Sequence, residues 1–394
     1  MNKMTIRDFD FKDKRAIVRV DFNVPLNEQG QVIDDARIEA ALPTIRYILA
    51  NDVKKLILMS HLGRPKGKIV ESLRMSPVAA SLESLLGEPV AKLNDCVGEA
   101  VSSAVESIPQ RVIVLENLRF HPEEKAGDES FAGKLAGLAD IYVNDAFGTA
   151  HRVHASTTKI AKYIPSCIGF LIEKEIQYLT KALHPVKPYV VILGGAKVSD
   201  KIEMVDNLIG QVDKILIGGA MAYTFLKSKG TPVGNSRVED EKIDLAGNIL
   251  HKAEEKNVKI VLPVDHVVVR SVDNPGTKEI VDEIPDGFIG VDTGPKTINS
   301  FVRELKDAKT ILWNGPLGIF ENPHYAEGTK EIALFLAKLD GATVIVGGGD
   351  TASAASEFNV KDKLSHISTG GGASLSFLEG KELPAITAIS DKTN

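Results

Sequence analysis

The sequence predicts an α/β protein with two lobes, each built on a parallel β-sheet flanked by helices, and joined by a hinge helix. Short apolar, β-branched segments alternate with longer amphipathic segments along the chain, which is the pattern of successive βαβ units. The chain has 394 residues, more than one hydrophobic core usually supports, so two domains are expected. Near residue 170 a helical pattern separates two halves of similar length.

Periodicity and composition identify the individual elements. The expected strands are 15–20, 55–59, 111–115 and 140–143 in the first half, and 189–193, 214–217, 259–262, 310–312 and 343–346 in the second. The helix-like segments between them include 37–50, 77–86, 130–138, 200–209 and 244–256.

The region around residue 170 sets the domain boundaries. Apolar residues at 172, 176, 179 and 183 have helical spacing, and prolines at 185 and 188 stop the helix. We therefore expect an N-terminal lobe over 1–172, a connecting helix and hinge over 173–188 (the helix being 173–183), and a C-terminal lobe over 189–381. The segment 382–394 contains an apolar run that needs burial, and we expect it to return to the N-terminal lobe.

Composition excludes several classes of protein. A net charge of −6 argues against a general nucleic-acid binder. No apolar run approaches the roughly 20 residues that span a bilayer, and the N-terminus has no apolar core of a secretory signal. Two cysteines without such a signal, Cys96 and Cys167, indicate reduced thiols and a cytoplasmic location.

The two halves carry different residues after their strands, where ligands bind in open parallel sheets. In the first half these positions hold arginine and histidine, which suit a small polyanion because guanidinium groups bind carboxylate and phosphate in a bidentate manner. They are Arg37, His61, Arg64, Arg119, His121, His151, Arg152 and His154.

In the second half the corresponding positions hold glycines, which let the backbone and helix N-termini approach phosphate. The glycine segments begin at residues 194, 218, 315, 347 and 370. Lys197 and Lys201 follow the glycine segment that begins at residue 194, and they are one helical turn apart. We therefore expect them to share one face of a helix that begins after these glycines. This half is expected to bind nucleotide phosphates, although no G-x-x-x-x-G-K-[ST] motif is present.

Together these segments resemble the phosphoglycerate kinase family. The segments VRVDFNVP, SHLGRP, LENLRFHPEE, NDAFGTAHRVHAST, GGAKVSDKI, WNGPLGIFE, GGGDT and STGGGASLSFLEG occur in that order over essentially the whole chain. The resemblance implies reversible phosphoryl transfer between 1,3-bisphosphoglycerate and ADP, giving 3-phosphoglycerate and ATP with Mg²⁺. It also implies two Rossmann-like lobes and a monomer in the cytoplasm with a role in glycolysis. From the charge and the apolar runs described above, we expect no nucleic-acid or membrane partner.

The resemblance also implies roles for individual residues. The substrate-binding set is Asp21, Phe22, Asn23, Arg37, His61, Leu62, Gly63, Arg64, Arg119 and Arg152. The nucleotide-binding set is Lys197, Lys201, Gly290, Glu321, Gly348, Gly349, Asp350 and Thr351, with Asp350 on the metal. Arg37, Lys197 and Gly349 are the implied catalytic residues.

Alternatives remain open from the residues alone. A nicotinamide dehydrogenase has the same architecture, but its glycine fingerprint is missing. A non-catalytic protein that closes on a phosphorylated metabolite would not need the second, glycine-and-lysine set. Asp350 is also placed to cap a helix over 351–358, and His121 and His154 suit structural or pocket-edge positions.

Overall fold

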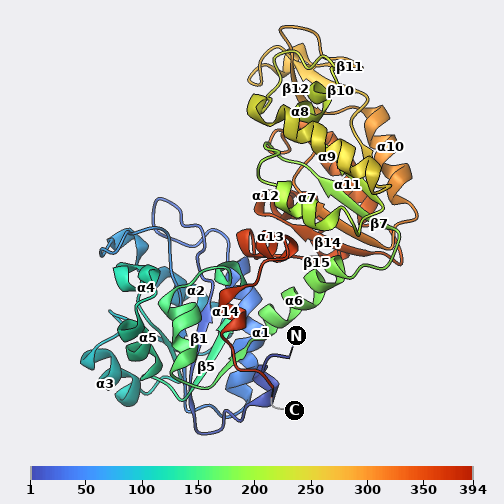
Figure 1. Ribbon diagram of the computed structural model, residues 1–394. Coiled ribbons are helices and arrows are strands. Elements are labelled where there is room, and N and C mark those ends of the chain that lie inside the picture. The colour runs from blue at the N-terminus through green and yellow to red at the C-terminus, as the bar shows by residue number, and fades with distance from the viewer. Residues whose placement is uncertain (1, 393–394) are drawn as a thin grey trace. The chain divides into compact units, whose positions relative to one another are not determined.

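The computed structural model describes residues 2–392 and divides the chain into two compact units. The first unit contains the chain up to Ile176 and the segment that begins at Glu382, and the second runs from Gln177 to Lys381. Each unit contains a six-stranded sheet with helices packed around it (Figure 1). The predicted α/β class with two parallel sheets is confirmed. No helix within residues 2–392 is long and apolar enough to cross a membrane.

The sheet of the first unit has the order β3-β4-β2-β1-β5-β6, and every neighbouring pair is parallel. Its central strands are almost continuously apolar, as expected for strands covered on both faces. The sequence did not predict β3 and β6, because their segments VAK and SCI lack the consecutive β-branched residues that identified the equally short β4, VIV. The strands are β1 Arg15–Val20, β2 Lys55–Met59, β3 Val90–Lys92, β4 Val112–Val114, β5 Ile141–Asp145 and β6 Ser166–Ile168.

Helices of the first unit bury their apolar faces against this sheet. Ile38 and Ile45 of one helix pack with Val18, Val20 and Leu56 of the strands in a single core. The helices are α1 Ala36–Ala50, α2 Ser76–Leu86, α3 Glu99–Ser107, α4 Pro122–Ala126, α5 Glu129–Ala136 and α14 Pro384–Thr387.

The C-terminal segment lies in the first unit. Met4 N–H donates to Ser390 O at 2.9 Å, and Ala385 N–H donates to Ala150 O at 3.1 Å. Ile386 is buried, and α14 lies among the blue and green elements of this unit in Figure 1. The apolar run of this segment is therefore buried.

Helix α6, Phe170–Leu183, begins three residues before the expected start at Glu173. Its first turn is anchored from β5, because Asp145 Oδ1 accepts hydrogen bonds from the N–H groups of Leu171 and Ile172. That anchor comes from 26 residues earlier in the chain, so helical periodicity gives no sign of it. The boundary between the two units falls inside this helix, after Ile176.

The main sheet of the second unit has the order β15-β14-β13-β7-β8-β9 and is also parallel throughout. Its strands are β7 Tyr189–Leu193, β8 Lys214–Ile217, β9 Lys259–Val261, β13 Thr310–Asn314, β14 Thr343–Gly347 and β15 His366–Ile367. A small antiparallel sheet, which the sequence did not predict, consists of β10 His266–Val269, β11 Glu279–Val281 and β12 Ile289–Thr293.

Helices follow most strands of the second unit, as in βαβ units. They are α7 Ile202–Leu208, α8 Met221–Ser228, α9 Ile243–Glu255, α10 Pro295–Leu305, α11 Glu327–Leu336, α12 Gly349–Glu357 and α13 Gly372–Leu378. The start of α12 differs from the expected helix over 351–358. Gly348, with φ 91°, occupies the N-cap position, so the interpretation of Asp350 as the cap is wrong.

Candidate active site

Strand order brings the predicted residues of the first unit to one edge of the sheet. Strands β4, β2, β1 and β5 are consecutive neighbours, so the loops at their carboxyl ends share that edge. Asp21 and Asn23 follow β1, His61 and Arg64 follow β2, Arg119 follows β4, and Arg152 follows β5.

Asp21 presents an unused acceptor at this edge. One carboxylate oxygen, Oδ2, accepts a hydrogen bond from Arg37 Nη1. The other, Oδ1, is buried and receives no hydrogen bond from the residues that the structure describes. His61 Nδ1 is 3.9 Å from it, beyond hydrogen-bonding distance. A buried acceptor without a donor is costly, so a ligand hydroxyl that donates to Oδ1 would be favoured.

The β2 loop is fixed by contacts from two neighbouring loops. Asn23 Oδ1 accepts from Gly63 N–H at 2.8 Å, and Arg119 Nη1 donates to Gly63 O at 2.9 Å. Both contacting side chains therefore have a defined position before any ligand binds, and Arg119 keeps other N–H groups for a ligand.

Phe22 and Leu62, which the family resemblance included, have their side chains in the hydrophobic core. Their backbones are also occupied, since Phe22 N–H donates to Ser60 Oγ at 2.9 Å, and Leu62 N–H and O bond to the Asn117 amide. These residues shape the loops around Asp21 and His61, and their side chains offer nothing to a ligand at this edge.

Positive charge at this edge is largely uncompensated. Arg64 and Arg152 are exposed and Arg119 is half-buried. Within residues 2–392 none of these three arginines has a carboxylate at ion-pair distance, whereas Arg37 is paired with Asp21. Three guanidinium groups without a carboxylate partner, on the loops that follow β2, β4 and β5, suit a small anion with several charges.

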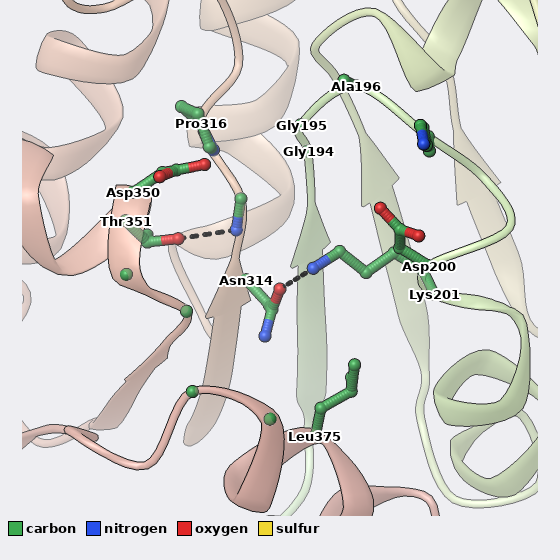
Figure 2. A pocket seen from close by; sticks show the side chains of 16 residues that line it. Gly194, Gly195, Ala196, Asp200, Lys201, Asn314, Pro316, Asp350, Thr351 and Leu375 are labelled. Carbon is green, nitrogen blue, oxygen red and sulfur yellow. Dashed lines mark hydrogen bonds between the residues drawn. The ribbon is translucent and has the colours of Figure 1, made fainter. Parts of the chain in front are cut away.

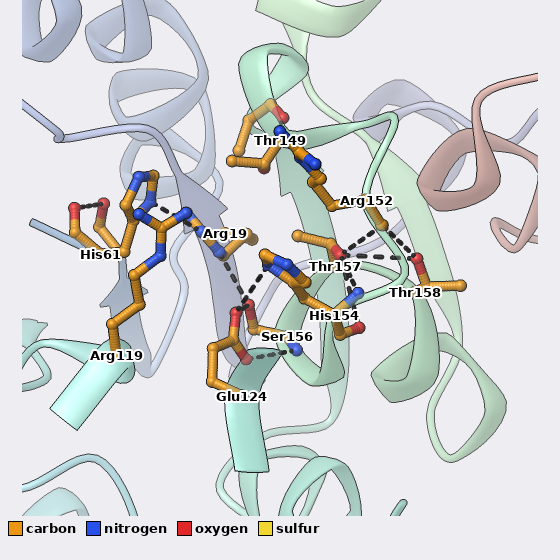
Figure 3. Close-up of polar contacts among 12 residues, drawn as sticks. Arg19, His61, Arg119, Glu124, Thr149, Arg152, His154, Ser156, Thr157 and Thr158 are labelled. Atoms are coloured by element: carbon orange, nitrogen blue, oxygen red, sulfur yellow. Dashed lines mark hydrogen bonds and ion pairs between the residues drawn. The ribbon is translucent and has the colours of Figure 1, made fainter. Parts of the chain in front are cut away.

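A buried polar network that sequence reasoning missed supports this edge (Figure 3). Arg19 is fully buried in β1; its Nε donates to Ser156 Oγ at 2.9 Å and its Nη2 lies 3.1 Å from His61 Nδ1. Glu124, also fully buried, accepts from Ser156 N–H at 2.9 Å and from Ser156 Oγ at 2.6 Å. A charged residue inside an apolar strand was the available signal for Arg19, but nothing in the sequence indicated its partner.

His61 and His154 are neutral at pH 7. Burial, followed by the charges of Arg19 and Arg119, lowers the pKa of His61 well below its usual range. The same causes lower the pKa of His154 to about 4. The positive charge therefore comes from the guanidinium groups, and His61 can act only as a neutral hydrogen-bonding group.

In the second unit, glycine-rich loops and Lys201 surround a cavity of about 460 Å³ (Figure 2). It is lined at its polar end by Lys197, Asn314, Asp350 and Thr351. Lys201 Nζ donates to Asn314 Oδ1 at the end of β13, and Thr351 Oγ1 accepts from Gly315 N–H at 2.7 Å. The N-terminus of α12 opens on this cavity, so its free N–H groups are available to phosphate.

The expectation that Lys197 and Lys201 share a helix face is wrong. Residues 197–201 form a loop, and α7 begins only at Ile202. Glu239 holds this loop by accepting from Val198 and Ser199 N–H. Lys197 is exposed, whereas burial lowers the pKa of Lys201, with Asp200 and Asp350 acting in the opposite direction.

A second cavity of about 340 Å³ adjoins the first, since both are lined by Gly195, Ala196, Pro316 and Asp350. Its walls are more apolar and include Tyr223, Val272, Val291 and Leu317. Gly290 and Glu321, which the resemblance placed in the nucleotide-binding set, both line it. A Cβ on Gly290 would lie 2.2 Å from Tyr223 Oη, so only glycine fits there without displacing that ring.

The polar cavity also offers a place for a hard cation. Asp200 and Asp350 are the carboxylates among the residues that line it, and both are exposed. One or two carboxylates beside bound phosphates are the usual protein ligands of Mg²⁺. The donor chemistry therefore fits a magnesium–nucleotide complex, with Asp350 in the first turn of α12.

Comparison with known proteins gives one consistent result. A family model described as "Phosphoglycerate kinase" matches residues 6–381. A protein of that name from Thermosipho africanus is 54% identical, with 100% of this chain and 99% of that protein covered. Another from Moorella thermoacetica is 52% identical over 100% of both. The solved structure of phosphoglycerate kinase from Coxiella burnetii is similar with a TM-score of 0.88 and 38% identity, over 98% of each chain.

Proposed function

Since this chain belongs to the phosphoglycerate kinase family, we propose that its two units divide the reaction, the first holding 3-phosphoglycerate and the second the nucleotide. The protein is a phosphoglycerate kinase, a transferase with a carboxyl group as acceptor. It moves a phosphoryl group reversibly between 1,3-bisphosphoglycerate and ADP, giving 3-phosphoglycerate and ATP in glycolysis.

The unsatisfied Asp21 Oδ1 is the observation that carries the glycerate assignment. The substrate has one hydroxyl between a carboxylate and a phosphate, which matches a buried acceptor beside free guanidinium groups. Asp21 accepts from that hydroxyl and Asn23 helps to orient it. The remaining members of the set hold the non-transferred phosphate: His61 as a neutral donor, with Arg64, Arg119 and Arg152.

The nucleotide extends across the two adjoining cavities of the second unit. Its phosphates lie at the polar end, against Lys201 and the segment Gly348–Thr351 at the start of α12. Its adenosine lies at the apolar end, against Gly290, with Glu321 placed for the ribose hydroxyls. The shared lining residues of the two cavities support this continuous arrangement.

The chemical step needs no general base. The acceptor carboxylate is ionised at neutral pH because carboxyl groups have a pKa near 4. A carboxylate oxygen attacks the γ-phosphorus, the bond to the β-phosphate oxygen breaks, and ADP leaves. Arg37 from the glycerate side, and Lys197 with Gly349 N–H from the nucleotide side, stabilise the charge on the transferring group.

Mg²⁺ would be held by Asp350 together with the nucleotide phosphates, where it would neutralise their charge. The monomeric state and the cytoplasmic location are proposals that rest on family membership. Domain closure is a proposal as well: the two ligand sets belong to different units, and reacting atoms must come within about 3–3.5 Å. We expect bending at α6 and the 184–188 segment when both ligands are bound.

A binding and activity experiment tests this division. The full-length protein should form 1,3-bisphosphoglycerate from 3-phosphoglycerate and MgATP in a coupled assay. In calorimetric titrations, Asp21→Asn should weaken 3-phosphoglycerate binding by about 10- to 100-fold, the value of a hydrogen bond to a charged group, and leave MgATP binding unchanged. Lys201→Ala should do the reverse. Equal losses for both ligands in either variant would contradict the assignment.

A further inference from the structure

Three potential metal ligands lie together in the first unit and have no part in the proposed reaction. They are Asp95, Cys96 and His121, and one ligand atom from each lies within 4.8 Å of the other two. Asp95 and Cys96 lie between β3 and α3, and His121 immediately precedes α4. We propose that these three side chains form a zinc(II) site.

The distances are close to those of a bound ion. Zinc binds sulfur at about 2.3 Å and nitrogen or oxygen at about 2.0–2.2 Å, so neighbouring ligand atoms of a tetrahedral site are about 3.3–3.7 Å apart. The longest present separation, up to 4.8 Å, must therefore close by about 1 Å, and the 2.7 Å contact between His121 Nε2 and Asp95 Oδ1 must open by roughly half as much or slightly more. Side-chain rotation can supply this, because Asp95 and His121 have side-chain exposures of 52% and 29%, whereas Cys96 is fully buried and fixed.

Existing contacts already hold two of the ligands in position. His121 Nε2 lies 2.7 Å from Asp95 Oδ1, and the same oxygen accepts from Cys96 N–H at 2.7 Å. The imidazole also packs on the ring of Phe131, with centroids 5.2 Å apart. Zinc would replace the hydrogen shared by His121 and Asp95, while the packing of the imidazole is kept.

The ligand types select the metal. A thiolate, an imidazole and a carboxylate suit zinc, and three protein ligands with a partly exposed face leave a fourth position for water. Mg²⁺ prefers oxygen ligands only. The ligand set of this site therefore differs from that of the proposed Mg²⁺ site in the second unit. Zinc here would also restrain the loop that carries Arg119, two residues before His121.

Cobalt(II), a spectroscopic substitute for zinc, tests the proposal on the full-length protein. Titration with Co²⁺ should produce a thiolate-to-cobalt charge-transfer band with one ion per chain, which Zn²⁺ removes and Mg²⁺ does not. Cys96→Ser should abolish the band. The matched control, Cys167→Ser, changes another fully buried thiol of the same unit and should leave the band intact.

Variants of the two partly exposed ligands, Asp95 and His121, test the site without changing the buried Cys96, whose replacement could disturb folding. Asp95→Asn and His121→Asn should each weaken Co²⁺ binding at least tenfold, and should remove the rise in melting temperature that Zn²⁺ gives the wild-type protein. A band that persists in Cys96→Ser, or no band in the wild type at millimolar Co²⁺, would overturn the proposal. The three side chains would then be a hydrogen-bonded pair beside an inert thiol.

Discussion

Asp145, which anchors the first turn of α6, allows a test of how burial changes the protonation state of a carboxyl group. This carboxyl is fully buried at the end of β5. Its Oδ1 accepts from Leu171 N–H at 2.9 Å, while its Oδ2 has no partner among residues 2–392. Burial raises the pKa of Asp145 from 3.8 to about 7, against the opposing effect of the neighbouring Thr44 hydroxyl and of the hydrogen bonds from Ile172 and Leu171 N–H.

The sign and size of the effect follow from proton linkage. Between pH 3.8 and about 7 the folded protein holds a proton on Asp145 that the unfolded chain releases. Stability from this group is therefore fully present at low pH and is lost as pH rises through that window. At about 1.4 kcal/mol for each pH unit, the loss amounts to ~4 kcal/mol. Asparagine has a similar shape and does not titrate, so Asp145→Asn should remove this loss.

Urea unfolding of wild type and Asp145→Asn across about pH 5 to 8 measures the difference. Circular dichroism follows both units, and fluorescence of Trp313, the only tryptophan, reports the second unit alone. Because this range covers only the upper part of the window, the stability of the variant relative to wild type should rise with pH by ~3 kcal/mol in the phase of the first unit. Parallel profiles would show that the carboxylate is ionised in the folded state and that the N-terminus of α6 stabilises its charge.

Asp140→Asn is a control of opposite sign in the same unit. A hydrogen bond from Arg15 lowers the pKa of the Asp140 carboxyl. Stability from Asp140 is therefore present above its unfolded pKa and is lost as pH falls through the folded pKa. Relative to wild type, this variant should be least stable near neutral pH and should converge with wild type in acid.

Further predictions concern catalysis and ligand binding. Arg37→Ala should lower kcat by roughly 10²–10⁵ with a much smaller effect on 3-phosphoglycerate binding; a kcat within about threefold of wild type would remove it from the mechanism. Lys201→Ala should chiefly raise the KM for ATP in steady-state assays, and an effect on kcat alone would contradict this. Gly290→Ala should raise the KM for ATP because the methyl group displaces Tyr223, whereas Gly210→Ala, with no atom within 4 Å of the new Cβ, should not. Small-angle scattering should show a larger contraction with both ligands than with either one; identical profiles would exclude closure.

The first-unit site was largely predictable because it depends on two local rules. Apolar, β-branched segments identified β1 and β2 at their observed bounds, Arg15–Val20 and Lys55–Met59. Parallel sheets collect the loops after their strands at one edge, so Asp21, His61 and Arg119 were placed correctly relative to their strands without coordinates.

Contacts between distant segments set the limits of this approach. The spacing of Lys197 and Lys201 indicated a helix, but Glu239, about 40 residues away, holds that segment as a loop. The small antiparallel sheet was missed because β11 has only three, mostly exposed residues, and because a glycine and an aspartate interrupt the apolar pattern of β12. Such features depend on tertiary partners that a linear pattern does not encode.

The net charge that a ligand meets at the edge holding Asp21 depends on which charged side chains lack a partner within the protein. The total number of charged side chains there matters less. Arg19 and Glu124 are both fully buried and are connected through Ser156, so their opposite charges offset each other within the protein. Burial keeps His61 and His154 neutral. The charge that remains for a ligand therefore belongs to the arginines without carboxylate partners among residues 2–392. Under the proposed assignment, an anion that binds there would supply the missing negative charge, and its hydroxyl would supply the donor that Asp21 Oδ1 lacks. One ligand would then satisfy both the unpaired arginines and the unpaired carboxylate oxygen.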